Sequence, residues 1–231
     1  ENRRALIAAM MNEVKTYGYD GINIDFEKVS SDNGIHFIQF LRELSIECRN
    51  EGVVLSVDNY VPMPHSAHYD RAEQGAIVDY VIVMAYDEHY NGSEEAGSVA
   101  SLGFVRSGIE NTTAVVPAKK TINALPFYTR MWEEYVDENG QRVLNSKAYT
   151  MKGAYARVEE LGLVVNWSDT MGQYVAEGDV DGHHYSVWLE DADSIEAKMK
   201  LVAEYGIGGV SAWSLGGEFP EVWEVIAEYN K

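Results

Sequence analysis

The chain repeats one local pattern: an amphipathic helix, a glycine, and then a short apolar run. The apolar runs that follow such a glycine are residues 21–26, 53–57 and 207–213. Apolar residues three and four positions apart predict the helices, and a glycine directly after them is a common helix end. Short, almost continuously apolar runs between helices are typical of buried strands in a parallel sheet. The pattern therefore predicts an α/β fold.

Two more apolar runs, residues 80–85 and 121–125, raise the number of predicted parallel strands to five. The stretch 133–185 departs from the pattern. Asn139-Gly140 is a hairpin signal there, and residues 149–161 form a separate helical segment. We expect residues 133–185 to be a small α+β insertion before the last helix and the last parallel strand.

The composition argues against several classes of partner. The 231 residues include 18 Lys and Arg against 37 Asp and Glu, a formal net charge of −19. A nucleic-acid partner is not expected, because binding one needs a clustered basic surface. The apolar runs are far shorter than the ~20 residues of a membrane span, so a membrane partner is not expected either. Cys48 is the only cysteine, which rules out an internal disulfide.

The first residues suggest a part of a longer protein. The chain begins with Glu1 rather than Met, shows no secretory signal, and enters a predicted helix within a few residues. We therefore expect a processed or excised piece, and the residues themselves give no localisation.

The first predicted strand carries the most informative polar residues of the chain. Alternate side chains of a strand point to opposite faces, so one face holds the polar residues Asn23, Asp25 and Glu27. The other face holds Ile22, Ile24 and Phe26. Helices cover the outer face of such a sheet, so the apolar row should lie under the helices. The polar row is then expected to face the inside.

Two carboxylates about one pleat apart cannot both stay charged cheaply, so one of the pair Asp25 and Glu27 should hold a proton. A protonated carboxyl near neutral pH is what a general acid needs. Glu27 is nearest the carboxyl end of the strand and is placed to reach a substrate. The alternative is a solvated strand end whose acids bond to neighbouring loops.

Histidines in two places invite a metal interpretation. His65, His68 and Asp70 lie in a Pro-containing loop that no second carboxylate cluster joins. The pair His183-His184 is an even weaker candidate for a metal site. We therefore predict no metal site.

Residues 20–27, Asp-Gly-Ile-Asn-Ile-Asp-Phe-Glu, resemble the fourth-strand signature of glycoside hydrolase family 18, the chitinase-like TIM barrels. The family pattern is Asp-Gly-x-Asp-x-Asp-x-Glu. Asn23 stands where chitinases usually have Asp, and in this respect the segment is similar to the branch of spore-cortex-lytic N-acetylglucosaminidases.

Three later segments resemble family motifs in the same order. They are residues 84–87 (Met-Ala-Tyr-Asp), 125–130 (Leu-Pro-Phe-Tyr-Thr-Arg) and 187–216, which resemble the sixth strand, the seventh strand, and the eighth helix and strand. The resemblance covers nearly the whole chain. It implies a TIM (β/α)8 barrel of which residues 1–231 hold about strands 4 to 8, a partial catalytic barrel with the α+β insertion at 133–185.

The resemblance also implies a mechanism. In family 18 the N-acetyl oxygen of the substrate attacks the anomeric carbon and forms an oxazolinium intermediate, with retention of configuration. By matching position, Glu27 is expected to protonate the leaving oxygen and later to activate water. Asp25 is expected to hydrogen-bond the acetamido N–H, and Tyr86 to bond the same group. The mechanism needs no cofactor.

Other residues are assigned lesser roles by the resemblance. Asn23 and Asp20 are expected to support the proton of Asp25. The expected substrate-binding residues are Met84, Asp87, Tyr128, Arg130 and Trp213. Without the motifs, a core position is the more frequent interpretation for Met84, Tyr86 and Trp213, and Arg130 could have a surface role.

The leading function is hydrolysis of β-1,4 bonds next to N-acetylglucosamine in peptidoglycan or a related polymer. The alternatives are a chitinase, or a carbohydrate-binding protein with little catalysis, although the presence of both Asp25 and Glu27 favours catalysis. The resemblance implies an extracellular or cell-envelope location in a bacterium. It also implies that three barrel units precede the first strand. We expect the open side to be covered by those units on a separate piece, by another copy of the chain, or by a local rearrangement.

Overall fold

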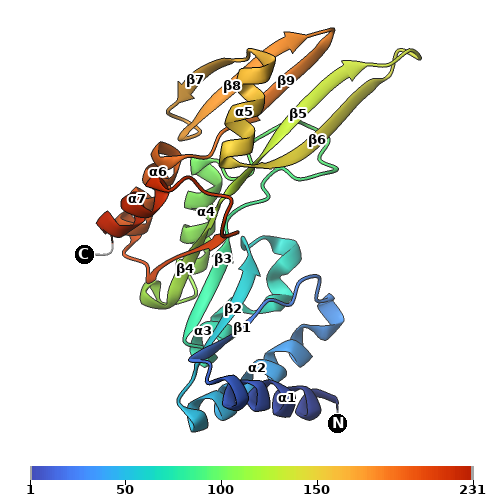
Figure 1. Cartoon of the computed structure of the whole chain (residues 1–231). Coiled ribbons are helices and arrows are strands. Elements are labelled where there is room, and N and C mark those ends of the chain that lie inside the picture. Colours follow the sequence, from blue (N-terminus) through green and yellow to red (C-terminus); the bar gives the residue numbers. More distant parts are fainter. Residues whose placement is uncertain (1, 230–231) are drawn as a thin grey trace. The chain divides into compact units, whose positions relative to one another are not determined.

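The computed structural model describes residues 2–229, and Figure 1 shows its helices and strands in chain order. The chain divides into two compact units. Unit 1 consists of Glu1–Met84, Gly108–Asn123 and Gly206–Gly209. Unit 2 consists of Ala85–Ser107, Ala124–Tyr205 and Val210–Lys231.

The predicted α/β fold is confirmed, and its parallel strands form one sheet of five. The order in the sheet is β1 (Gly21–Ile24), β2 (Val54–Tyr60), β3 (Tyr80–Met84), β4 (Thr121–Pro126) and β10 (Gly209–Trp213). Strands β1 and β2 pair in parallel, as do β2 and β3. All five lie where the sequence predicts apolar strands.

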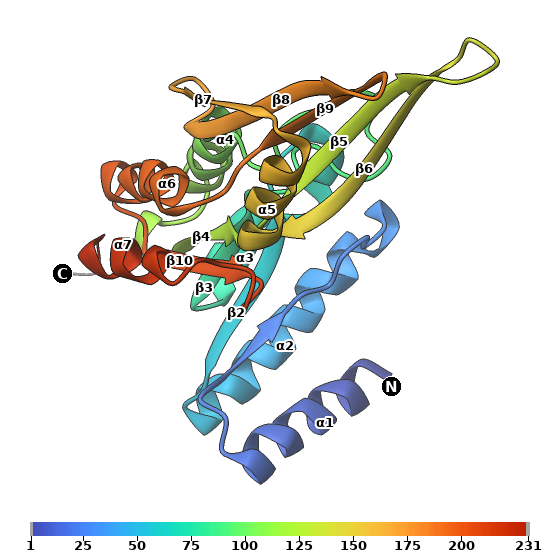
Figure 2. The same cartoon turned by 45° about the horizontal axis from the view of Figure 1, so that its top comes forward.

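The first three helices of the chain belong to unit 1. They are α1 (Asn2–Tyr17), α2 (Gly34–Glu51) and α3 (Arg71–Ile77), with short 3-10 turns at Ser31–Asn33, Pro64–Tyr69 and Ala118–Lys120. Helix α3 contacts α2 and β3, whereas α1 and α2 share a core with β1 and β2 (Figure 2), in which Leu41 and Leu44 are fully buried. Helix α2 ends at Gly52, whose φ of 70° lets its N–H bond the carbonyls of Arg49 and Cys48.

Strand β1 is shorter than the sequence predicts. It ends at Ile24, so Asp25 follows the strand and Glu27 lies in a turn with Lys28, whose φ is 56°. The apolar side packs as predicted at Ile24, which is 1% exposed. Phe26 is 40% exposed, although its ring stacks on Phe40 with centroids 5.4 Å apart, and Asn23, Asp25 and Glu27 are exposed.

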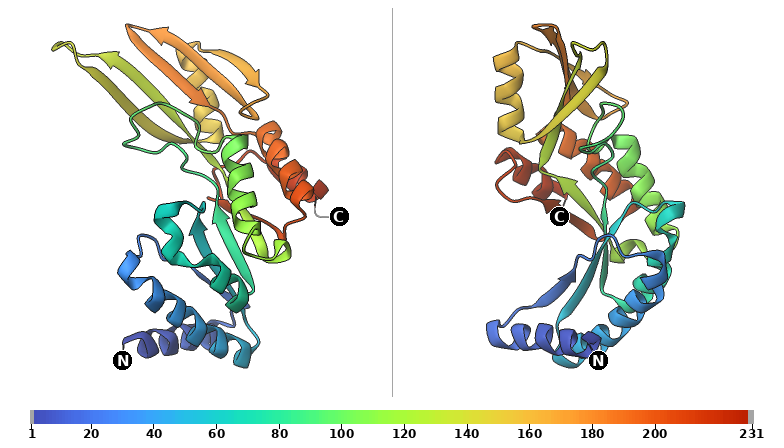
Figure 3. Two further views of the ribbon diagram at one scale, coloured as in Figure 1. Left: turned by 180° about the vertical axis from the view of Figure 1, so that it is seen from behind. Right: turned by 90° about the vertical axis from the view of Figure 1, so that its right-hand side faces the viewer.

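Unit 2 holds a second, antiparallel sheet. Its order is β6 (Arg142–Thr150), β5 (Tyr128–Val136), β9 (His183–Trp188), β8 (Gln173–Val180) and β7 (Val164–Ser168). Helix α5 (Met151–Leu161) packs on one face of it, as seen in Figure 3. Gly140, with a φ of 77°, lies in the turn between β5 and β6, where the sequence predicts a hairpin. This sheet runs from Tyr128 to Trp188, whereas the predicted insertion covers 133–185, and its status as an insertion stays a prediction.

Helices α6 (Ala192–Tyr205) and α7 (Glu221–Tyr229) close the chain, and α4 (Leu102–Thr113) lies between β3 and β4 in sequence. The sequence analysis does not predict α4 or α7. In unit 2, Lys198 of α6 forms a buried ion pair with Glu190 at 2.9 Å. Ser194 and Gln173 donate further hydrogen bonds to the same carboxylate. A buried charge of this kind needs such a full set of partners.

None of the helices within residues 2–229 has the length and apolar character that crossing a bilayer requires.

Candidate active site

The predicted site residues of unit 1 lie on the ends of β1 and β2. The parallel register sets Asn23 opposite Ser56, so the two side chains share one face of the sheet. Ser56 Oγ donates a 2.7 Å hydrogen bond to Asn23 Oδ1, and Asn23 Nδ2 donates a 2.8 Å bond to Asp58 Oδ2. The amide of Asn23 is therefore held in one orientation by two side chains of the neighbouring strand.

Glu27 is held by the same neighbouring strand. The hydroxyl of Tyr60 donates a 2.9 Å hydrogen bond to Glu27 Oε2, and the backbone N–H of Lys28 donates to the Tyr60 oxygen at 3.3 Å. Burial, and then this bond to the carboxylate, raise the pKa of Tyr60 to about 12. The phenol therefore keeps its proton and acts as a donor to Glu27.

Three carboxyls of unit 1 influence one another electrostatically. Partial burial, followed by the charge of Glu27, raises the pKa of Asp25. Burial raises the pKa of Asp58 to about 6; the hydrogen bond from Asn23 opposes this shift, and the charges of Asp25 and Glu27 add to it. One carboxyl of such a group is readily protonated near neutral pH, which is the state a general acid requires.

Asp58 and Tyr60 belong to this group, but the sequence analysis does not identify them. The sequence carries a signal for them, which is the alternation of residues along β2. Ser56, Asp58 and Tyr60 occupy alternate positions, and the residues between them, like Leu55 before them, are buried. Alternation of this kind places all three on the face that carries Asn23.

Two further predicted residues of unit 1, Met84 and Asp20, lie at opposite ends of the strands. Met84 is the last residue of β3 and stands opposite Tyr60 in the strand register, with 9% of its surface exposed. Asp20 precedes β1, where its carbonyl accepts the N–H of Val54 at 2.9 Å. Asp20 is thus at the opposite end of the strand from Glu27, and its supporting role stays a prediction.

In unit 2, the structure brings together Tyr86, Asp87 and Tyr128. The Tyr128 hydroxyl donates a short hydrogen bond to Asp87 Oδ1, and its ring meets that of Tyr86 edge to face with centroids 6.0 Å apart. Burial and the bond to Asp87 raise the pKa of Tyr128. This phenol too stays protonated as a donor.

Arg130 and Trp213 also lie in unit 2. Arg130 Nη1 donates a 3.0 Å bond to Ser146 Oγ, and Arg130 Nε is buried without a hydrogen-bond partner among the described residues. Trp213 is 61% exposed at the end of β10, which contradicts its alternative interpretation as a core residue. Its carbonyl accepts the N–H of Phe127 at 2.6 Å.

Residues 2–229 contain no group of three or more His, Cys, Asp or Glu arranged to hold a metal ion. Two of the histidines weighed as ligands have other contacts. His68 Nε2 lies 2.7 Å from the carbonyl of Val29, and His183 Nδ1 lies 2.9 Å from Glu133 Oε1.

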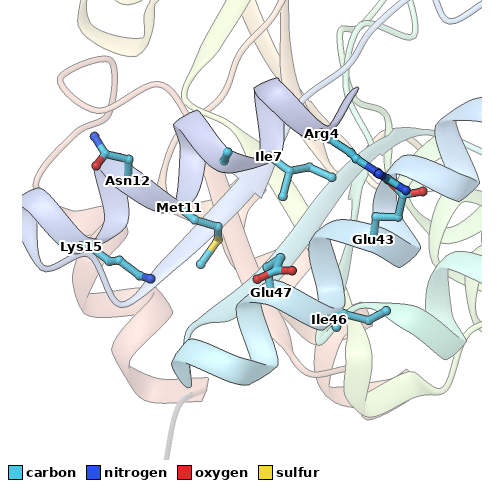
Figure 4. Close-up of a pocket in the computed structure, with 9 residues that line it drawn as sticks. Arg4, Ile7, Met11, Asn12, Lys15, Glu43, Ile46 and Glu47 are labelled. Carbon is cyan, nitrogen blue, oxygen red and sulfur yellow. The ribbon is translucent and has the colours of Figure 1, made fainter. Parts of the chain in front are cut away.

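A cavity of about 640 Å³ opens between α1 and α2 of unit 1, as Figure 4 shows. Its polar lining includes Arg4, Lys15, Glu43 and Glu47, and its apolar lining includes Met11. None of the predicted site residues lines it. The candidate site is therefore defined by side chains at strand ends and not by this cavity.

Carboxyl groups at the carboxyl ends of parallel strands, with protonated phenols donating to them, are typical of hydrolases built on α/β barrels. Comparison with known proteins gives the family. Residues 1–218 match the family described as Glycosyl hydrolases family 18, and the chain belongs to this family. The resemblance inferred from the four motifs is thereby confirmed.

Several curated relatives are similar over almost the whole chain. The Bacillus subtilis protein YdhD, named as a sporulation-specific glycosylase, is 32% identical over 96% of this chain and 53% of its own length. A cortical fragment-lytic enzyme of Bacillus subtilis is 28% identical over 98% of this chain and 53% of its own length. The chain thus spans about half the length of these relatives.

Solved structures show the same fold. A chitinase from Chromobacterium violaceum, 26% identical, superposes with a TM-score of 0.85 over 97% of this chain and 70% of that one. The Bacillus cereus spore cortex-lytic enzyme SleL, 27% identical, gives 0.84 over 96% of this chain and 51% of that one.

Proposed function

We propose that this protein is a glycoside hydrolase that cleaves β-1,4 bonds next to N-acetylglucosamine, in peptidoglycan or a related polymer. The observation that carries the proposal is the carboxyl of Glu27, which the Tyr60 hydroxyl orients and which Asp25 precedes by two residues; the pKa of Asp25 is raised by burial and by the charge of Glu27. An oriented carboxyl with a second carboxyl close by is what acid catalysis assisted by the substrate's acetamido group needs.

The proposed mechanism is substrate-assisted and retaining. Glu27 donates a proton to the leaving glycosidic oxygen while the substrate's acetamido oxygen attacks the anomeric carbon. Asp25 accepts a hydrogen bond from the acetamido N–H, which orients the attacking oxygen and stabilises the positive charge of the oxazolinium. Glu27, now ionised, then takes a proton from water as the water opens the oxazolinium, so the anomeric configuration is retained.

Unit 2 and the end of β3 are proposed to bind the sugar. Tyr86 is proposed to donate to the acetamido group, and Met84 to contact the sugar. The exposed indole of Trp213 offers an apolar surface on which a pyranose ring can stack. Asp87 and Tyr128, which bond each other, and Arg130 are proposed to add polar contacts to hydroxyl groups.

Peptidoglycan is preferred over chitin because the curated relatives above are named for sporulation and cortex lysis. A cell-envelope or extracellular location in a bacterium follows from the same names. A chitinase remains the alternative, supported by the likeness to the Chromobacterium violaceum enzyme. A net charge of −19 does not favour attraction to an anionic wall, so we propose that separate wall-binding modules provide that affinity.

We propose that another segment or chain pairs with or packs on the edge strand of the parallel sheet, β1. Strand β1 is the first strand in the sheet order and is paired with β2 on one side. An edge strand left unpaired is prone to aggregation. The proposed cover is either further barrel units, as the greater length of the relatives suggests, or another copy of the chain, and full activity depends on it.

The test is digestion of purified peptidoglycan and of chitin oligomers in parallel, with mass spectrometry of the new reducing ends. We expect new N-acetylglucosamine reducing ends from peptidoglycan. Cleavage of chitin oligomers alone would establish the chitinase alternative. Binding of either polymer without cleavage, in the presence of intact Asp25 and Glu27, would establish a carbohydrate-binding protein.

A further inference from the structure

We propose that Gln173 and Ser98 are positioning residues, which tie a substrate-binding loop of unit 2 to the buried ion pair at α6. The loop consists of residues 86–101, called the site loop below, and it begins with Tyr86 and Asp87. The proposal rests on the proposed function, in which those two residues contact the sugar. None of the family motifs covers Ser98 or Gln173.

Asp87 turns the chain in a backbone conformation that other contacts must hold. Its φ is 56°, in the left-handed region that residues other than glycine seldom adopt because it costs free energy. The Tyr128 hydroxyl supplies one such contact, since it donates a hydrogen bond to the Asp87 carboxylate. Further contacts come from the part of the site loop that follows Asp87.

The two limbs of the site loop pair with each other directly after Asp87. The backbone N–H of Glu88 donates a 2.9 Å hydrogen bond to the carbonyl of Val99. The N–H of His89 donates a 3.2 Å bond to the carbonyl of Ser98. Val99 and Ser98 are buried, whereas Asp87 is exposed. The buried returning limb is therefore the support for the exposed part of the loop.

The side chain of Ser98 connects this limb to the interior of unit 2. Ser98 Oγ donates a 2.6 Å hydrogen bond to Gln173 Oε1 and accepts the N–H of Ala100 at 2.9 Å. Gln173, the first residue of β8, donates from Nε2 to Glu190 Oε1 at 2.8 Å. Lys198 Nζ donates to both oxygens of that carboxylate at 2.9 Å. A continuous series of side-chain contacts thus runs from α6 to the site loop.

These contacts are buried along their whole length. Gln173, Glu190 and Lys198 are each 0% exposed, and Ser98 is 1% exposed. A hydrogen bond lost in such surroundings is not replaced by one to bulk water, so each group depends on the partner that it has. The Gln173 amide uses both of its ends, its oxygen toward the site loop and its nitrogen toward the ion pair. Gln173 is therefore the link between the two and acts on the site through the loop.

Ser194 bonds the same carboxylate without replacing this link. Its hydroxyl donates a 2.6 Å hydrogen bond to Glu190 Oε2, whereas Gln173 bonds Oε1, and the Ser194 side chain is 0% exposed. Ser194→Ala removes a buried bond to the ion pair but leaves the bond from Gln173 in place. This variant therefore separates a loss of stability from a loss of positioning.

The direct test is amide hydrogen exchange of the full chain, followed by NMR, which needs no activity. Gln173→Met keeps the length of the side chain and removes both polar ends, and Ser98→Ala is the milder variant. We expect the Glu88 and His89 amides to exchange roughly tenfold faster in both variants, under conditions where each is folded. Ser194→Ala, the matched control, should leave these two rates unchanged. Unchanged rates in either loop variant, or an equal increase in Ser194→Ala, would overturn the proposal.

The kinetic test uses the same variants on the polymer that the protein cleaves. Tyr86 is proposed to bond the acetamido group whose oxygen attacks, so a displaced site loop should lower kcat roughly tenfold and change KM by less than about threefold. Ser194→Ala should lower Tm but keep kcat. The double variant Ser98→Ala/Gln173→Met should be no slower than the slower single variant, because both changes remove the same link.

Two kinetic outcomes would contradict the positioning role. They are losses of kcat that multiply in the double variant, and a loss in Ser194→Ala as large as in Gln173→Met. If no polymer is cleaved at all, the proposed function fails, while the exchange rates still decide whether the site loop depends on Gln173.

Discussion

Tyr60 on β2 donates a 2.9 Å hydrogen bond to Oε2 of Glu27, the carboxyl that follows β1. The two residues are 33 positions apart in sequence and meet because β1 and β2 pair in parallel. The carboxyl thus has a fixed direction, although its own backbone lies in a turn outside the sheet.

Replacing this phenol should weaken catalysis without unfolding the protein. Tyr60→Phe removes the donor to Glu27 and keeps the ring, so we expect kcat to fall roughly tenfold with little change in Tm. Tyr17→Phe, at a 63% exposed position on α1, is the control and should leave both unchanged. A kcat equal to that of the wild type would show that the hydrogen bond does not orient the acid.

The acid itself is tested by Glu27→Gln. The amide keeps the shape of the side chain and can still bond to Tyr60, but it has no proton to transfer. We expect hydrolysis to fall by at least roughly 10²-fold while circular dichroism and polymer binding are retained. Near-normal turnover would refute the assignment of Glu27.

Substrate assistance makes a separate prediction about ligands. A thiazoline that mimics the oxazolinium should inhibit, and substrates without the N-acetyl group should not be cleaved. Inhibition constants and product analysis by mass spectrometry provide the measurement. A sugar ester trapped on Asp25 would refute the mechanism and favour a direct enzyme nucleophile.

The ion pair between Glu190 and Lys198 should be important for stability. Both side chains are at most 1% exposed, so Glu190→Gln leaves the Lys198 cation buried without its counter-charge. We expect the free energy of unfolding to fall by about 3–5 kcal/mol. The control is Lys200→Met, which removes the exposed pair with Glu196 and should change stability by less than about 1 kcal/mol. Equal losses in the two variants would contradict the prediction, which urea unfolding measures.

Cys48 should report on unfolding of unit 1. The side chain is 1% exposed, and burial, with the charges of Asp79 and Glu47, raises the pKa of its thiol to about 11. At pH 8 the native thiol should react with a disulfide reagent roughly 10²-fold more slowly than in guanidinium chloride. Since the native state holds this proton longer than the unfolded state, the contribution of Cys48 to stability should fall as the pH rises above about 8.5. Equal rates in both conditions would show that Cys48 is accessible in the native state.

The sequence by itself determined the elements of the parallel sheet and the family. Helix periodicity and terminal glycines such as Gly52 depend on local backbone preferences, and a buried strand needs a continuous apolar run, so both features can be read from neighbouring residues. The alternation of Ile24 with Asn23 and Asp25 likewise predicted which side faces the helices. These features can be predicted from the sequence because each depends only on residues that are close together in it.

The tertiary structure decided how the acids are held. Strand β1 ends at Ile24 and Phe26 packs on α2, so Glu27 lies in a turn, where Tyr60 donates a hydrogen bond to it. The bond from Asn23 to Asp58 joins residues 35 positions apart. Which residues of two strands face each other depends on their register, and the register is set by packing of the whole core rather than by either strand alone. For this reason the sequence predicted Asp25 and Glu27 as candidate site residues, while only the fold identified Tyr60, which bonds Glu27, and Asp58, which bonds Asn23.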